Sequence, residues 1–129
     1  MILTLRSSFS SAHFYHQPLW SEEQNLHVFG RCHTPYGHGH NYTLEVAFHC
    51  QSDRSEPLRQ KYQALLQELT SVIDHEHLNF VIPEFKNQVP TTENIARYFW
   101  QKLSARVPNS ELVSLRLFEM PQLWVEITA

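Results

Sequence analysis

Two histidines separated by one glycine mark the part of this sequence most suited to metal chemistry. His38 and His40 flank Gly39, and the residues that follow alternate between apolar and polar, as in a half-buried strand. Side chains two positions apart on a strand project to the same face, so both imidazoles can reach one ion. His13 ends another predicted strand and offers a third imidazole. Three histidines with a fourth position open to substrate form a recognised type of catalytic zinc site, although any one of these histidines alone is more typical of a surface or loop position.

A thiol and an acid–imidazole pair offer proton transfer beside such an ion. Cys32 lies six residues before His38, and a thiol near a cation or a histidine has a lowered pKa, which makes it a usable base or nucleophile. Asp74 and His75 follow a predicted helix, where a carboxylate that orients an imidazole beside a thiol would complete a proton relay. The alternatives are a packed or metal-bound thiol and a histidine that stabilises a helix C-terminus.

Glu119 is the candidate for binding an organic substrate. It lies among apolar residues between Leu117 and Pro121. An ionised carboxylate in such surroundings needs a partner or a ligand that donates hydrogen bonds. The alternative is a residue at the end of a strand that faces water.

The elements that must position these residues follow from periodicity. Alternation predicts strands over residues 2–14, 38–48, 112–118 and 123–127, the last two forming a hairpin across Pro121. Helical spacing predicts helices over 56–73 and from Thr91 to about Ala105, and residues 17–25 are expected to form a loop. This order predicts an α+β fold, a four-stranded antiparallel sheet with two helices packed on one face (ββααββ). The other face then needs cover, which oligomerisation would provide.

Size and composition exclude several classes of protein. A chain of 129 residues with 42% hydrophobic residues suits a single domain, residues 1–129, with one core. The net charge of −3 without a basic stripe argues against a nucleic-acid partner. No apolar run approaches the ~20 residues that span a bilayer, so we expect no membrane partner and a cytoplasmic protein. Two cysteines, Cys32 and Cys50, are too few for a disulfide framework.

Taken together, these residues resemble the 6-pyruvoyl-tetrahydropterin synthase family, also called the tunnelling-fold pterin synthases. Four separated blocks carry the resemblance in order along the chain. They are Phe9-Ser-Ser-Ala-His13, Phe29-Gly-Arg-Cys-His-Thr-Pro-Tyr-Gly-His-Gly-His-Asn-Tyr42, Asp74-His75 with Leu78-Asn79, and Thr91-Thr92-Glu93-Asn94 followed at a distance by Glu119. The second block is highly specific, so the resemblance implies the tunnelling fold over most of the chain.

The resemblance implies three groups of site residues. The zinc ligands would be His13, His38 and His40. The catalytic proton-transfer group would be Cys32, Asp74 and His75. The pterin pocket would contain Glu119, Thr91, Thr92 and Glu93. In that pocket the Glu119 carboxylate would accept paired hydrogen bonds from the 2-amino group and the ring N–H of the pterin.

The implied activity is that of a zinc-dependent carbon–oxygen lyase. It would convert 7,8-dihydroneopterin triphosphate to 6-pyruvoyl-tetrahydropterin with loss of triphosphate, a step toward tetrahydrobiopterin that needs no external nicotinamide. The resemblance also implies a homohexamer of two stacked trimers, in which Asp74 and His75 would serve a neighbouring subunit's zinc.

Two alternatives to this activity remain at the level of the sequence. The first is the 6-carboxytetrahydropterin synthase of the queuosine pathway, which uses the same substrate and the same kinds of catalytic residue. The five residues between Cys32 and His38 are typical of the pyruvoyl-forming branch and favour that product. The second alternative is a non-catalytic zinc- or pterin-binding module, against which the joint presence of Cys32, Asp74, His75 and Glu119 argues.

Overall fold

A five-stranded sheet forms the frame of the protein, and the structure, a computed structural model, describes residues 1–129. The strands are β1 (Ile2–His13), β2 (His38–His49), β3 (Glu76–His77), β4 (Leu112–Met120) and β5 (Leu123–Thr128), in the spatial order β3-β1-β2-β4-β5. The α-helices are α1 (Glu22–Phe29), α2 (Ser55–Ile73), α3 (Leu78–Val81) and α4 (Thr92–Ser104). Short 3-10 turns lie at Gly30–Cys32, Ser52–Arg54 and Pro83–Phe85.

The expected α+β class is confirmed, but the expectation of four antiparallel strands is wrong in one respect. A fifth strand, β3, pairs in parallel with the outer edge of β1, which makes the sheet mixed. The backbone of His75 adopts a φ of 61°, and its N–H donates to the Ser10 carbonyl oxygen at 2.6 Å. This turn lays the next two residues alongside β1. A strand of two residues is too short to produce an alternating pattern, so no local signal predicts it.

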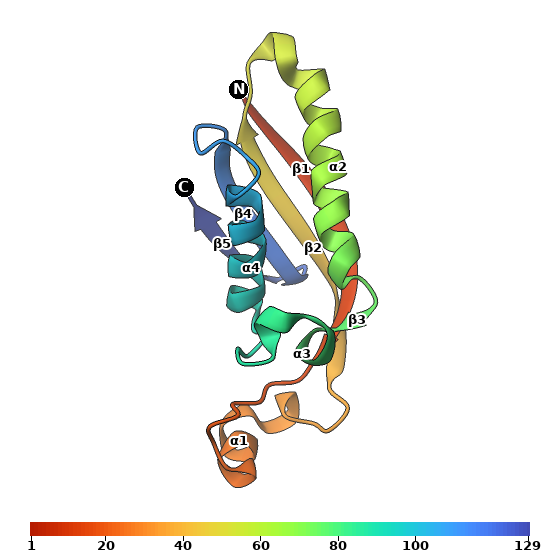
Figure 1. Ribbon diagram of the computed structural model, residues 1–129, viewed down its shortest axis with the longest axis vertical. Helices are drawn as coiled ribbons and strands as arrows, with labels where there is room; N and C mark the ends of the chain where they lie inside the picture. The colour runs from red at the N-terminus through yellow and green to blue at the C-terminus, as the bar shows by residue number, and fades with distance from the viewer.

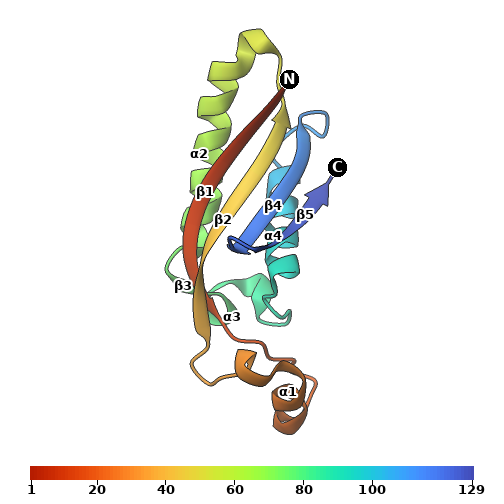
Figure 2. The same ribbon diagram turned by 180° about the vertical axis from the view of Figure 1, so that it is seen from behind.

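Helices α2 and α4 lie across the same face of the sheet (Figure 1), while the view from behind shows strands with no helix in front of them (Figure 2). The predicted positions of both helices are confirmed. Thr91 caps α4, its hydroxyl accepting a hydrogen bond from the Asn94 N–H at 3.2 Å. Every second residue of the central strands faces these helices, and Phe9 and Tyr42 stack there with ring centroids 4.9 Å apart. No helix has the length and apolar character that crossing a bilayer requires.

The α1 lobe, which we define as residues 14–37, extends beyond the end of the sheet where β1 stops and β2 starts (Figure 1). The expectation of a loop over residues 17–25 is wrong for its second half, because α1 begins at Glu22. Ser21 caps this helix by accepting a hydrogen bond from the Gln24 N–H, and Gly30, with a φ of 54°, ends it. The lobe returns the chain to the sheet next to its point of departure.

A row of alternating charges, Arg6–Glu45–Arg116–Glu126, crosses the helix-free face of the sheet. These four residues occupy directly paired positions on β1, β2, β4 and β5. The Glu45 carboxylate forms ion pairs with Arg6 at 2.6 Å and with Arg116 at 3.6 Å. Arg116 also forms an ion pair with Glu126 at 3.0 Å. The centre of this face is therefore polar and paired in charge.

Candidate functional site

Three imidazoles meet at the end of the sheet next to the α1 lobe. His13 ends β1 directly opposite His38, the first residue of β2, and His40 follows two positions later on the same face. One ring nitrogen from each lies within 4.8 Å of the others. The Nε2 atoms of His13 and His38 are 3.2 Å apart. The structure thus brings together the three histidines that the sequence singled out as metal ligands.

His13 is neutral at ordinary pH, as a histidine that binds a metal must be. Its side chain is fully buried, and this burial, followed by the proximity of His38 and His40, lowers the pKa of His13 to about 3. The Tyr42 hydroxyl lies 3.1 Å from His13 Nδ1. When Nδ1 donates to that hydroxyl, Nε2 keeps its lone pair and points at the other imidazoles. The convergence of three imidazole nitrogens within 4.8 Å of one another fits a divalent metal ion.

The turn into β2 approaches the end of β1 too closely for any side chain. Gly37 has a φ of 71°, and a Cβ atom built there would lie 2.4 Å from the carbonyl oxygen of His13. Only glycine adopts this backbone conformation readily and leaves room for the neighbouring strand. This glycine therefore allows His38 to lie opposite His13.

Glu119 reaches the same cluster from β4. Its Oε1 atom lies 3.5 Å from His40 Nε2 and 3.9 Å from His13 Nε2, and the residue is 8% exposed. The pairing of β4 with β5 is irregular between Phe118 and Met120, the position of Glu119. No hydrogen bond from the chain reaches its carboxylate. It therefore adds negative charge beside the imidazoles and remains able to accept hydrogen bonds from a bound molecule.

Cys32 and Glu93 share a neighbour, Tyr15, which lies beside this cluster. The Tyr15 N–H donates to the Cys32 carbonyl oxygen at 2.7 Å, and the Tyr15 ring lies 5.2 Å from the His13 ring. Burial raises the pKa of the Tyr15 phenol, and the charges of Glu119, Cys32 and Glu93 raise it further. Three predicted site residues thus influence one phenol beside the histidines.

Sequence reasoning missed Tyr15. This residue lies in no periodic segment, and its only signal is its position two residues after a candidate metal ligand. Thr91, Thr92 and Glu93 lie at the N-terminus of α4, where the sequence predicted the start of a helix. There Thr91 caps the helix and Thr92 is buried.

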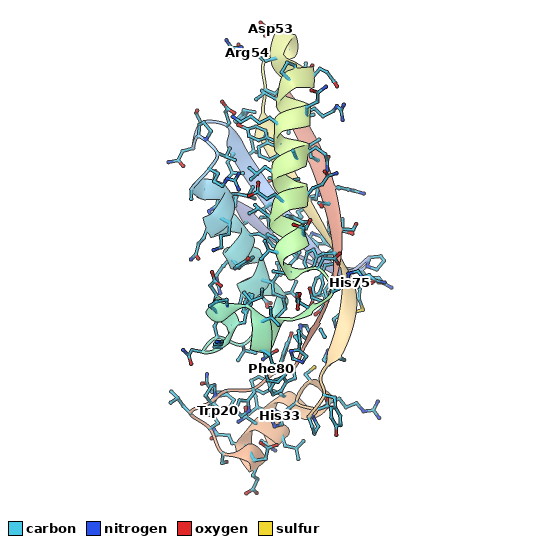
Figure 3. The ribbon with its side chains drawn as sticks, turned by 45° about the vertical axis from the view of Figure 1, so that its right-hand side comes forward. Trp20, His33, Asp53, Arg54, His75 and Phe80 are labelled. Atoms are coloured by element: carbon cyan, nitrogen blue, oxygen red, sulfur yellow. The ribbon has the colours of Figure 1, made fainter.

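Asp74 and His75 lie directly before β3, at the outer edge of the sheet. The Asp74 carboxylate accepts a hydrogen bond from the Ser10 N–H at 2.8 Å and lies 2.9 Å from His75 Nδ1, contacts that together lower the pKa of Asp74. The His75 side chain is 83% exposed, and Figure 3 shows it projecting outward beside β3. No hydrogen bond or ion pair joins either residue to Cys32. Within one chain the structure does not bring this pair to the thiol.

A hollow of about 490 Å³ lies beside His75. It is lined by residues of β1, β2 and β3 and the turn before β3: Ser10, Ser11, Ala12, Gly39, His40, Asn41, His75, Glu76 and His77. His40 thus contributes both to the imidazole cluster and to the wall of this hollow. His75 and one metal-ligand candidate therefore line the same hollow.

Comparison with known proteins gives a consistent set of similarities. The sequence profile of the family described as 6-pyruvoyl tetrahydropterin synthase matches residues 2–129. The 6-pyruvoyl tetrahydrobiopterin synthase of Drosophila melanogaster is 35% identical over 93% of this chain and 74% of its own length. The Homo sapiens protein of the same name is 36% identical over 88% of this chain and 81% of its own length. The structure of Caenorhabditis elegans 6-pyruvoyl tetrahydropterin synthase superposes with a TM-score of 0.86 at 28% identity, covering 100% of this chain and 95% of that one.

Proposed function

The chain belongs to the 6-pyruvoyl tetrahydropterin synthase family, and from this we propose that it is a lyase acting on 7,8-dihydroneopterin triphosphate. Its product would be 6-pyruvoyl-tetrahydropterin, released with triphosphate, and residues 1–129 would act as one pterin-synthase domain. The observation that carries this proposal is the imidazole cluster of His13, His38 and His40, beside the Glu119 carboxylate that accepts no hydrogen bond from the chain.

Zinc is the metal that we assign to the imidazole cluster, with His13, His38 and His40 as its ligands. Neutral imidazole nitrogens are preferred zinc ligands, and three of them leave a position for substrate. When bound, zinc would act as a Lewis acid that makes a side-chain hydroxyl of the substrate more acidic. The Tyr42 hydroxyl would hold the His13 ring in the tautomer that leaves Nε2 free.

Glu119 would anchor the pterin ring by accepting hydrogen bonds from its 2-amino group and ring N–H. A charged acceptor that faces two donors fixes the orientation of a planar ligand. Because no hydrogen bond from the chain reaches the carboxylate, which lies 3.5 Å from His40 Nε2, its oxygens would be available for this role. Thr91, Thr92 and Glu93, at the start of α4, would complete the pocket.

Proton transfer would fall to Cys32 together with Asp74 and His75. The Asp74 carboxylate accepts from His75 Nδ1, so the Nε2 atom of this ring is left to exchange protons. The reaction reduces the pterin ring at the expense of the substrate side chain, so movement of protons is all that these residues must supply. Since the pair faces outward and lies apart from Cys32 in one chain, it would serve the thiol of a neighbouring subunit.

The assembly that provides such a neighbour would be a homohexamer of two stacked trimers. The helix-free face of the sheet and the outward direction of His75 support an arrangement in which subunits cover each other's exposed edges. Active sites would then form where subunits meet.

The decisive experiment is to incubate the purified, zinc-loaded protein with 7,8-dihydroneopterin triphosphate and identify the pterin product by mass. We expect the pyruvoyl product. A carboxy product would instead place the protein with the 6-carboxytetrahydropterin synthases, and unchanged substrate would contradict the lyase proposal.

The role of Cys32 is tested in the same assay. Cys32→Ala should lower turnover by about 10²–10⁴-fold, the usual contribution of a proton-transfer group, while zinc content stays unchanged. Cys50→Ala is the matched control, since this buried thiol lies at the opposite end of β2 and should not affect turnover. A loss of zinc in Cys32→Ala would show that the thiol is a metal ligand.

A further inference from the structure

A second group of metal-binding side chains lies in the α1 lobe, outside the His13 cluster. His16, Glu22 and His33 each present one ligand atom, and these atoms lie within 4.8 Å of one another. The same distance relates the ligand atoms of the His13 cluster. None of the three residues has a part in the chemistry proposed above.

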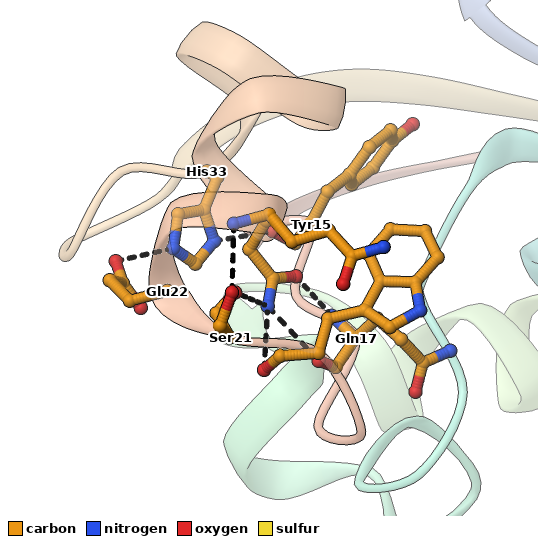
Figure 4. A network of polar contacts seen from close by, with 8 residues as sticks. Tyr15, Gln17, Ser21, Glu22 and His33 are labelled. Carbon is orange, nitrogen blue, oxygen red and sulfur yellow. Dashed lines mark hydrogen bonds and ion pairs between the residues drawn. The ribbon is translucent and has the colours of Figure 1, made fainter.

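His33 is oriented as metal-binding histidines are. It is 8% exposed, its Nδ1 lies 2.7 Å from the Tyr15 carbonyl oxygen, and its Nε2 lies 2.7 Å from Oε1 of Glu22 (Figure 4). The carbonyl and the carboxylate both only accept hydrogen bonds, so without an ion both ring nitrogens donate. A metal ion would take the place of the Nε2 proton between His33 and Glu22, while Nδ1 still donates to the carbonyl. A backbone carbonyl that fixes the tautomer in this way is the usual outer partner of a histidine ligand.

His16 supplies an imidazole nitrogen that has no other use in the chain. Its Nδ1 atom is enclosed and has no hydrogen-bond partner. Buried polar atoms in folded proteins are nearly always paired, so an unpaired one calls for an explanation such as an absent ion. The ring packs against two other rings, His33 at 5.3 Å and Phe14 at 5.8 Å between centroids, both stacked.

The surrounding structure holds these ligands without help from an ion. The Asn25 side-chain amide donates to the carbonyl oxygens of Gln17 and Ser21, and its oxygen accepts from the Gln17 N–H at 2.6 Å. These bonds fix the start of α1, where Glu22 lies, against the segment that carries His16 (Figure 4). Ligands that are positioned in advance lose less entropy when an ion binds.

We propose that His16, Glu22 and His33 bind a second divalent metal ion of the zinc type. Two imidazoles and one carboxylate form a ligand set that proteins use for zinc. The Glu22 side chain is 78% exposed, so the ion would be reached from solvent and would keep a water ligand. Because His33 directly follows Cys32, and Tyr15 bonds to both residues, an ion here would fix the backbone that positions the thiol.

The test is to measure zinc bound per chain by titration of metal-free protein against a chelator that buffers free zinc. We expect a second equivalent in the unaltered protein. Glu22→Gln and His16→Gln should each weaken the second equivalent by at least about tenfold while leaving the first unchanged. Glu23→Gln is the matched control, because this neighbouring carboxylate lies outside the cluster and its loss should change neither equivalent.

A separate variant distinguishes this site from the His13 cluster. His13→Asn should lose the equivalent that the proposed function requires and retain the one in the α1 lobe. Circular dichroism of each variant confirms that the fold persists. Binding of a single equivalent by the unaltered protein, or retention of both with equal affinity in Glu22→Gln and His16→Gln, would overturn the proposal while leaving the proposed lyase activity untouched.

Discussion

At the scale of single residues, the metal centre depends on which nitrogen of His13 is free. Burial keeps this imidazole neutral by lowering its pKa to about 3, but burial alone does not decide which nitrogen carries the proton. The Tyr42 hydroxyl is the partner of Nδ1, and when Nδ1 donates to it, Nε2 keeps its lone pair facing His38 and His40. A residue that binds no metal itself therefore sets the direction of a ligand.

Tyr42→Phe should weaken zinc binding by about tenfold to a hundredfold, the usual effect of removing an outer partner of a histidine ligand. The ring that stacks on Phe9 is retained, so the fold should persist. Competition with a chromogenic chelator measures the change.

The control for this variant is Tyr62→Phe. Tyr62 is also fully buried, and its hydroxyl donates to Glu111, far from the imidazoles. Its loss should lower stability by about 1 kcal/mol without changing zinc affinity. Equal zinc affinities in Tyr42→Phe and the unaltered protein would refute the role of this hydroxyl.

Spacing predicted the metal-ligand candidates at this scale, but it did not place Glu119 beside them and did not indicate Tyr15. His38 and His40 share a face because strands have a period of two, and this can be read from sequence. The proximity of Glu119 and Tyr15 to them depends on β4 lying beside β2 and on the path of the α1 lobe. Such long-range placement leaves no local pattern.

At the scale of elements, the turn that enters β2 carries the strictest steric requirement. Gly37→Ala would combine a positive φ with a Cβ placed 2.4 Å from the His13 carbonyl oxygen. We expect the free energy of unfolding to fall by about 3 kcal/mol, from backbone strain and overpacking together, with weaker zinc binding. Urea denaturation of the metal-free protein measures the stability.

Gly30→Ala is the matched control, since it also has a positive φ but nothing lies within 4 Å of its Cβ position. Strain alone should lower its stability by about 1–2 kcal/mol, with zinc affinity unchanged. Equal losses of stability in the two variants would show that the close approach to β1 has no energetic importance.

Long periodic elements were predicted well and short ones were not. The strands β1, β2, β4 and β5 and the helices α2 and α4 each contain enough residues to display a period. The two residues of β3 cannot, and α1 buries only Asn25, so its eight residues show no apolar stripe. Tertiary contacts rather than local pattern place these two elements.

At the scale of the whole molecule, the proposal that Asp74 and His75 act on a neighbour's thiol predicts complementation between inactive variants. Cys32→Ala and His75→Ala should each be inactive alone. Mixed oligomers, refolded together in equal amounts, should regain about a quarter of normal turnover, because that share of sites would combine an intact thiol with an intact imidazole from different chains.

Light scattering on each sample establishes that the mixtures have the same mass as the unaltered assembly. Refolding each variant alone is the control for activity gained by handling. If the mixture stays inactive while the oligomers form normally, the thiol and the imidazole belong to the same chain.

The row of charges on the helix-free face bears on how the strands find their alignment. A slip of one residue between β1 and β2 turns every apolar side chain to the wrong face, but a slip of two preserves the apolar pattern. The charges distinguish the correct register from one shifted by two residues. Such a shift would separate Arg6 from Glu45 and, at the far end of the same strands, His13 from His38. Each opposite-charge pair across strands contributes about 0.2–1 kcal/mol. Burial of apolar side chains does not distinguish the correct register from one shifted by two residues, but the ion pairs on the helix-free face do. They favour the register in which His13 and His38 meet on the opposite face of the sheet.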